Sequence, residues 1–349
     1  MTTSTEPTIH LDHAAHRNEL KAAGITVAQL RAAENAGEIT EFRTEFFGPP
    51  ALKTASRTEK LSAAIAAYAR YYGIDDPVAT SHTAAQFHGL PTRTDSPSAY
   101  RAAPLYLLDH SPTAKTVRRT AAEVFADKRP RTSVTIDGVE VATIARTLVD
   151  MLHDNKYNRV GDDFLILGDH ALNRGLTTVA ELESEAELLP RSAVRNQTIK
   201  TLARLDGRCA TKSQTLSRKF LHSQGFPAPE MFTPIYSREG DVLTTPTFCW
   251  PDAKVVAFCV EPEQNYCDAF PRPDHERHNG HHHDHHRAPA TKSCPERNAV
   301  DDQLRNMGYH VFRWIGDRID TTGCDLCHLR EALDAPRPYP NSYDDPFCW

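Results

Sequence analysis

The sequence has no long apolar run. None of its stretches reaches the roughly 18 consecutive apolar residues that a membrane-spanning helix needs. The segment from Met1 to His13 is polar and lacks the apolar core of a secretory signal. We therefore expect a cytoplasmic protein that has no membrane partner.

A strong charge of either sign is also missing. The 349 residues include 40 Lys and Arg against 46 Asp and Glu, which gives a net charge of −6. A protein that coats nucleic acid by bulk charge is strongly basic, so any DNA contact here must come from a local patch. The 40% hydrophobic content is ordinary for a globular protein. The length and patterning predict a mixed α/β (α+β) chain of about two or three domains.

The first region, residues 1–56, reads as two helices followed by two strands. His16 to Ala23 is a short helix, and Thr26 caps a second helix over Val27 to Asn35, with Gln29 completing a capping box. Residues 38–47 alternate between apolar and polar, as in a two-stranded wing. This outline is typical of a winged helix-turn-helix.

Several polar side chains of that region are candidate DNA contacts. The second helix would face a groove, while the first helix and the wing would touch phosphates. The candidates are Arg17, Lys21, Gln29, Arg31, Asn35 and Arg43. These are fewer cations than a tight DNA reader carries, and a winged helix can also bind protein, so a protein partner stays open as the alternative.

The middle region, residues 57–208, mixes helices with strands. Helices are predicted over 58–72, 80–90, 143–153, 161–174 and 193–205, and strands over 104–109 and 133–141, the latter turning at Asp137-Gly138. The basic segments Lys115–Arg119 and Lys128–Arg131 are either a second phosphate contact or a solvated edge of the sheet.

One segment of the middle region holds a serine beside two histidines. Ser81, His82 and His88 would suit a nucleophile and its base. The sequence shows no third orienting group nearby, so we favour packing or capping roles, with Ser81 as the N-cap and His88 near the C-terminal dipole of the helix.

The third region, residues 209–334, has the order α-β-β-β-α-β. Its helices are expected over 213–223 and 296–307, and its strands over 232–237, 243–250, 255–260 and 310–315. This order predicts a mixed sheet flanked by helices. A His-rich insertion, 263–295, interrupts it, and a Pro- and Tyr-rich tail, 335–349, follows it.

The insertion and the last helix contain candidate metal ligands. The insertion offers His275, His278, His281, His282, His283, His285 and His286, flanked by Cys267 and Cys294. Such a tract binds zinc or nickel, or it is a low-complexity insertion of weak affinity, and we favour the second reading. Cys324 and Cys327 form either half of a zinc site or a pair of idle thiols. We expect no required cofactor.

Four segments of the chain carry a resemblance to a known family. They are Leu20–Thr26, Gly37–Arg43, Ser81–Pro91 and Val141–Asp150. They resemble the winged-helix antitoxins of the type IV abortive-infection (AbiEi) family. The resemblance implies a regulator that binds DNA and has a toxin as its protein partner.

The third region resembles the very-short-patch-repair (Vsr-type) endonucleases. The segments that carry this resemblance are 245–261 and 296–314. It implies a restriction-endonuclease-like fold in which carboxylates hold a magnesium ion against the phosphate. The family's metal-binding and catalytic positions fall on Leu216, Thr247, Val260 and Gln264.

None of those four side chains carries a charge that could hold magnesium. Glu261 and Glu263 lie next to the expected site and are the candidates for displaced ligands. We therefore expect a non-catalytic, DNA-associated or antitoxin-like regulator that contains an inactivated endonuclease domain. The alternatives are an active endonuclease that uses the displaced glutamates, and a zinc- or nickel-binding protein built around the histidines.

Overall fold

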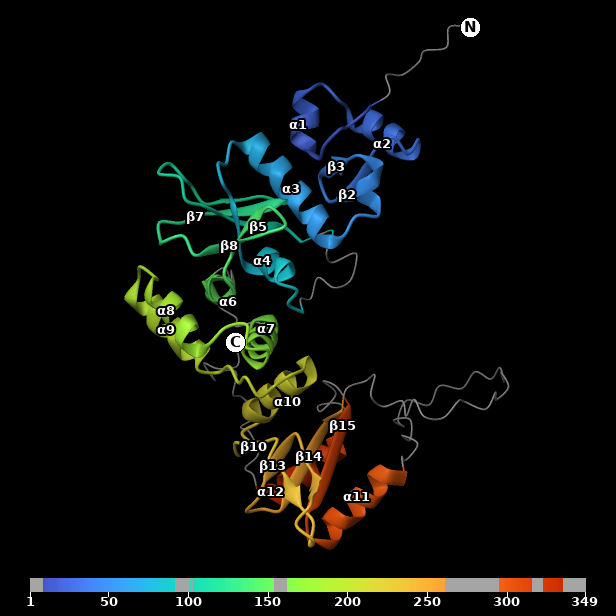
Figure 1. Cartoon of the computed structure of the whole chain (residues 1–349), viewed down its shortest axis with the longest axis vertical. Helices are drawn as coiled ribbons and strands as arrows, with labels where there is room; N and C mark the ends of the chain where they lie inside the picture. Colours follow the sequence, from blue (N-terminus) through green and yellow to red (C-terminus); the bar gives the residue numbers. More distant parts are fainter. Residues whose placement is uncertain are drawn as a thin grey trace, which may run out of the picture. The chain divides into compact units, whose positions relative to one another are not determined.

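The protein is a mixed α/β chain that folds as two compact units, Met1–Gly207 and Arg208–Trp349. A computed structural model describes residues 9–91, 101, 103–153, 162–260, 295–315 and 323–334 (Figure 1). The regions separated by sequence at residue 56 belong to the same unit. Within the described ranges, no helix is long and apolar enough to cross a bilayer.

The beginning of the first unit contains two helices and a small sheet. Its elements are β1 (Ala15–His16), α1 (Arg17–Ala22), α2 (Val27–Asn35), β2 (Thr40–Arg43) and β3 (Phe46–Gly48). The strands pair antiparallel in the order β1-β3-β2, so the sheet has one strand more than the predicted pair. The buried side chains of Leu20, Leu30, Ile39 and Phe47 hold the helices against the strands.

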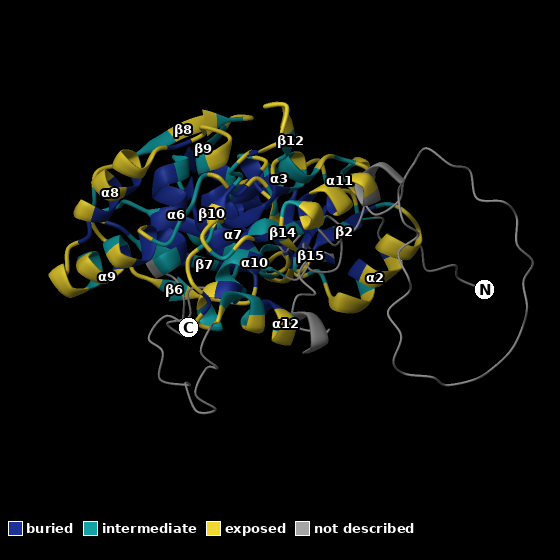
Figure 2. Cartoon of the chain, turned by 90° about the horizontal axis from the view of Figure 1, so that it is seen from below, coloured by how far each residue is buried: buried dark blue, intermediate teal, exposed yellow. Residues whose placement is uncertain are grey.

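The rest of the first unit is a six-stranded sheet with helices packed on it. The helices are α3 (Arg57–Tyr72), α4 (Ser81–Phe87), α6 (Ile144–His153), α7 (Asp162–Asn173), α8 (Val179–Glu187) and α9 (Ser192–Leu202). The strands β4 (Val78–Ala79), β5 (Leu105–Asp109), β6 (Val117–Arg118), β7 (Ala122–Ala126), β8 (Ser133–Ile136) and β9 (Val139–Ala142) lie in the order β6-β7-β5-β4-β9-β8. Figure 2 shows α6 mostly buried, whereas α8 and α9 expose much of their surface.

The hairpin of β8 and β9 follows directly from its turn residues. Asp137 and Gly138 both have a positive φ, of 49° and 77°. Two consecutive positive φ angles define the type I′ turn that an Asp-Gly pair favours between antiparallel strands. The pairing of Ile136 with Val139 confirms the predicted turn.

The second unit is built on a four-stranded mixed sheet. Its elements are α10 (Lys212–Ser223), β10 (Glu230–Met231), β11 (Ile235–Tyr236), β12 (Val242–Thr244), β13 (Phe248–Trp250), β14 (Val255–Val260), α11 (Pro295–Asn306), β15 (His310–Ile315) and α12 (Gly323–Leu333). The sheet order is β10-β13-β14-β15, and only β14 and β15 among these neighbours run parallel.

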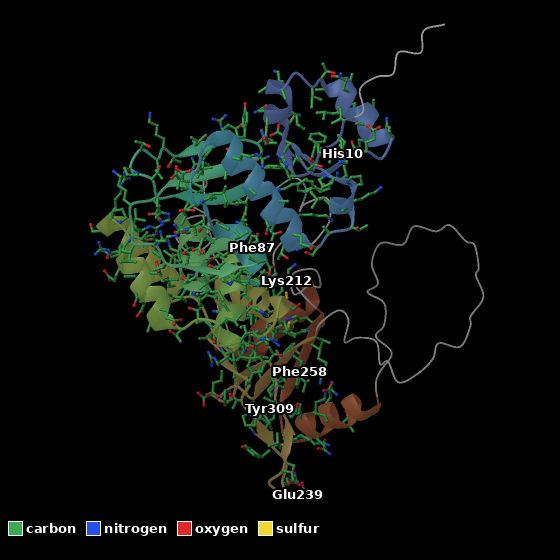
Figure 3. The ribbon with its side chains drawn as sticks, turned by 45° about the horizontal axis from the view of Figure 1, so that its top comes forward. His10, Phe87, Lys212, Glu239, Phe258 and Tyr309 are labelled. Carbon is green, nitrogen blue, oxygen red and sulfur yellow. The ribbon has the colours of Figure 1, made fainter. Side chains whose placement is uncertain are left out.

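Two predicted strands of this unit differ in the structure: 232–237 shortens to β11, and 243–250 divides into β12 and β13. Residues 232–237 and 243–250 contain Pro234 and Pro246, which cannot donate to a strand ladder. The pieces between the prolines, β11 and β12, pair with each other in a separate hairpin. Lys212 at the start of α10 and Glu239 in the hairpin turn lie at opposite ends of the unit (Figure 3).

Strand β14 separates two apolar cores. Val255, Ala257 and Cys259 belong to the core that contains Phe248 and Trp314. Val256 belongs to the other core, where α11 packs, and Phe258 lies against it. Because successive side chains of a strand point to opposite faces, the continuous apolar run of β14 is what a sheet covered on both faces requires.

Candidate functional site

The outward surface of α2 is the first candidate site. Thr26 and Gln29 form the predicted capping box, in which the Gln29 Oε1 accepts a hydrogen bond from the Thr26 backbone N at 2.9 Å. Gln29 is therefore used within the helix and is a poor candidate for a DNA contact. Arg31 and Asn35 are both exposed on the same helix.

Arg43 does not fulfil its predicted role. Its side chain is only 1% exposed, and its guanidinium donates to the backbone oxygen of Ala103. The expectation that it contacts phosphate is wrong. The cause is an irregularity in the ladder between Glu41 and Arg43, which turns Arg43 inward where strict alternation would place it outside.

The remaining cations near α2 are few. Arg17 forms an ion pair with Glu45, although its side chain stays 48% exposed. Lys21 is exposed on α1. A phosphate contact by Arg17 must compete with Glu45, so the cationic surface around α2 rests mainly on Lys21 and Arg31.

The second candidate site lies where the start of β13 meets the end of β14 in the middle of the sheet. The Vsr-type resemblance places the expected catalytic groups there. Thr247 is 6% exposed there, and its hydroxyl accepts a hydrogen bond from the backbone N of Cys259 at 3.1 Å. Val260 ends β14, and Leu216 is half-buried on α10. Thr247 therefore joins two strands at this position.

The polar groups beside Thr247 are also used for packing. The indole N–H of Trp314 donates to Ser217 on α10 at 2.8 Å, and the same hydroxyl lies 3.4 Å from the sulfur of Cys259. Hydrogen bonds of this kind satisfy buried polar atoms and fix the helix on the sheet. They provide no carboxylate oxygen for a magnesium ion.

A carboxylate on the opposite face of the sheet is likewise paired. Asp301 on α11 accepts a hydrogen bond from the Arg313 guanidinium at 2.6 Å. That guanidinium lies 3.9 Å from the centre of the Phe258 ring. Since Arg313 engages both oxygens of Asp301, this carboxylate is committed to an ion pair.

The described ranges contain no group of three or more His, Cys, Asp or Glu side chains that could hold a metal ion. Most of the predicted ligands lie outside those ranges. They are His275, His278, His281, His282, His283, His285, His286, Cys267 and Cys294, together with Gln264, Glu261 and Glu263. Cys327 is exposed on α12, and the side chain of Cys324 is outside the described part of that helix.

A third polar group, Asp163, lies near Ser81 and His82, and the sequence did not reveal it. The Ser81 hydroxyl lies 3.3 Å from the His82 Nδ1, and the His82 Nε2 lies 3.8 Å from Asp163. Ser81 has a positive φ of 50° at a strand-to-helix junction. Its side chain is nevertheless only 1% exposed, so the hydroxyl is inaccessible to a substrate as the chain stands.

The capping prediction for this segment is also corrected. The N-cap of α4 is Thr80, so Ser81 is the first residue of the helix. The His88 Nε2 lies 2.7 Å from the backbone oxygen of Ala142, and burial lowers the pKa of His88. His88 lies at the C-terminal end of α4, as predicted, and its ring bonds to the backbone of β9.

A buried cluster of charges in the first unit was not predicted. We call it the Arg146 network, and it consists of Asp127, Arg129, Arg146, Asp150 and Glu185. The Arg146 guanidinium bonds to Asp127, lies 3.2 Å from Asp150 and lies 3.4 Å from Glu185. Its side chain is 1% exposed.

Arg129 and Thr80 complete the hydrogen bonds of the Arg146 network. Arg129 donates to Asp150 at 2.7 Å, and the Thr80 hydroxyl donates to the other Asp150 oxygen at 2.6 Å. Burial alone would raise the pKa of Asp127, but hydrogen bonds and charge from Arg129, and the charge of Arg146, hold it below its ordinary value. The carboxylate of Asp127 therefore stays ionised.

The Arg146 network changes the interpretation of the basic segments. Arg129 is an internal ion-pair partner, so the phosphate reading of that residue is wrong. Arg118 pairs with Glu123 at 2.9 Å, and Arg131 lies 3.5 Å from Glu140. The sequence does contain one signal of the Arg146 network. Arg146 and Asp150 are four residues apart in a largely apolar helix, and this spacing is typical of paired charges. Charged side chains in such a helix are buried only when they are paired.

No protein-family model matches the chain, and no curated protein matches it in sequence.

Proposed function

We propose that this protein is a DNA-associated regulator that binds duplex DNA without cutting it. The observation that carries the proposal is the α1–turn–α2 pair followed by two antiparallel strands, with Arg31 and Asn35 exposed on the second helix. This is the element order of a winged helix-turn-helix, whose second helix enters the major groove. The AbiEi resemblance points in the same direction.

The second unit is proposed to be an inactivated endonuclease domain that acts as a binding or scaffold module. Its order of one helix, three sheet strands, a helix and a parallel fourth strand fits the restriction-endonuclease type. At the expected metal position the Thr247 hydroxyl bonds to the backbone of Cys259. A phosphodiesterase needs carboxylate oxygens there to hold its metal.

The affinity for DNA is expected to be low and sensitive to salt. Few cations surround α2, so few counterions are released on binding. A mobility-shift assay at about 50 mM and about 200 mM salt tests this, because each phosphate contact steepens the salt dependence. The double variant Lys21→Ala/Arg31→Ala is expected to lose most of the binding.

Arg174→Ala is the matched control, since Arg174 is an exposed arginine far along the chain from α2. It is expected to leave binding unchanged. Binding that survives in the Lys21→Ala/Arg31→Ala variant would show that α1 and α2 are not the DNA reader.

A toxin is the proposed protein partner, and this part rests on the AbiEi resemblance alone. If a nucleotidyltransferase-like toxin is encoded beside this protein, co-expression of the two should restore growth that the toxin alone prevents. Growth arrest that persists on co-expression would remove the antitoxin role and leave the DNA-binding proposal standing.

A further inference from the structure

The exposed face of α2 is narrower than its sequence suggests. Gln29 is held in the capping box, and Glu34 accepts a hydrogen bond from the backbone N of Glu41 at 3.0 Å. Leu30 and Ala33 are buried in the core below the helix. The side chains that remain on the outward face are Val27, Ala28, Arg31, Ala32 and Asn35.

These five residues form one continuous face. At about 100° per residue, Arg31 and Asn35 lie at its middle, Val27 lies on one side, and Ala28 and Ala32 lie on the other. Val27 is 56% exposed, so its side chain is available on this face. Two hydrogen-bonding side chains are therefore framed by small apolar groups.

Each of these side chains matches a chemical feature of the major groove. An arginine binds the O6 and N7 of guanine with two hydrogen bonds, and an asparagine binds the N6 and N7 of adenine in the same way. The methyl groups of alanine and valine contact the methyl group of thymine. Glu34 is also exposed, next to Val27, and one of its carboxylate oxygens is held by the backbone N of Glu41.

The spacing along the helix sets the spacing of the bases. Arg31 and Asn35 are four residues apart, which is about 6 Å along the axis at 1.5 Å per residue. Consecutive bases of one strand are about 3.4 Å apart. The two side chains therefore span about two base steps.

We infer that α2 reads a guanine through Arg31 and an adenine through Asn35, about two base steps apart in the major groove, with thymine methyls beside them. The inference rests on the proposed function, and it assigns sequence specificity to two side chains. Phosphate contacts carry no sequence information, so the discrimination between DNA sequences has to come from contacts with base edges.

The experiment is selection of binding sites from a randomised duplex, at low salt, with the full chain. The wild type is expected to enrich sites that contain a guanine and an adenine at that spacing. Arg31→Ala is expected to lose the preference for guanine and to keep the preference for adenine, and Asn35→Ala to do the reverse. Each lost preference corresponds to about 5- to 150-fold in relative affinity.

Arg174→Ala and Asn196→Ala are the matched controls, since each removes the same side chain from another exposed position. They are expected to select the wild-type sites. Thermal melting of all five proteins verifies that each variant is folded.

Binding without any base preference, or a preference that both α2 variants retain, would overturn the inference and leave the proposed function intact. Failure of the folded wild type to bind any duplex would overturn both.

Discussion

Arg146 and Asp150 lie one turn apart on α6 and form an ion pair of 3.2 Å, in which their side chains are only 1% and 7% exposed. The pair is shielded from water and surrounded by Asp127, Arg129 and Glu185. These partners come from the segment after β7 and from α8. The Arg146 network therefore ties the six-stranded sheet to the helical part of the first unit.

Removal of one partner from the Arg146 network should be strongly destabilising. Arg146→Met leaves three carboxylates in a buried site with Arg129 as their only remaining guanidinium in the network. The expected loss is about 3–5 kcal/mol in the free energy of unfolding. Urea unfolding measures it. Arg305→Met, which breaks the exposed pair with Asp302, is the control and should cost at most about 1 kcal/mol.

Thr247 should matter for stability. Thr247→Val keeps the shape of the side chain but removes the hydroxyl that accepts a hydrogen bond from the buried backbone N–H of Cys259. The expected cost is about 1–3 kcal/mol. Thr247→Ser keeps the hydroxyl and should retain the hydrogen bond, so it should lose less. Equal stability of the valine variant and the wild type would contradict this role.

Purified protein with Mg²⁺ or Mn²⁺ should not cleave duplex, mismatched or single-stranded DNA above background. The reason is that Leu216, Thr247 and Val260 supply no carboxylate oxygen for the metal. Incubation with labelled substrates tests this. Robust cleavage that is abolished by Glu261→Ala or Glu263→Ala would favour the displaced-ligand alternative.

Mild acid should destabilise the first unit. Burial is the largest influence on His16, His88 and His110, and it lowers the pKa of each below 6.5. The unfolded chain therefore takes up protons near pH 6.5, whereas the folded chain takes them up only at lower pH. The free energy of unfolding should consequently fall as the pH drops below about 6.5.

Urea unfolding between pH 7 and pH 5 measures this loss. His110→Gln should make it smaller, because one of the three proton-uptake sites is then removed. His10→Gln is the control, since it removes a histidine from an exposed position outside the core. A pH dependence that is the same in His110→Gln and in the wild type would contradict the prediction.

Deletion of residues 274–288 should leave thermal stability almost unchanged. This segment holds the seven histidines and shows no apolar periodicity, so it offers little surface to offset the entropy of ordering its backbone. Melting curves of the wild type and of the deletion variant, each with zinc and with chelator, test it. A large chelator-induced drop that only the wild type shows would identify a structural metal site.

Local signals in the sequence predicted much of the secondary structure. The limits of α2, β14 and β15 agree with the predicted ranges, because a capping box defines α2, an uninterrupted apolar run defines β14, and a largely apolar run after a glycine defines β15. The Asp137-Gly138 turn is equally local. In contrast, α8 and α12 were not predicted. Their acidic and mixed sequences carry a weak apolar pattern, and packing against neighbouring helices or strands decides their structure.

The sequence by itself determined which chemical groups are available, and the tertiary structure decided which of them face solvent. It showed that Thr247 carries no carboxylate for a metal ion, since residue identity alone excludes that ligand. It could not show that Arg43 is buried, because an irregularity in the pairing of β2 with β3 turns this side chain to the face of the sheet opposite the expected one. Nor could it bring Arg129 and Asp127 next to Arg146, because burial and charge pairing depend on residues that meet only when the sheet and helices pack.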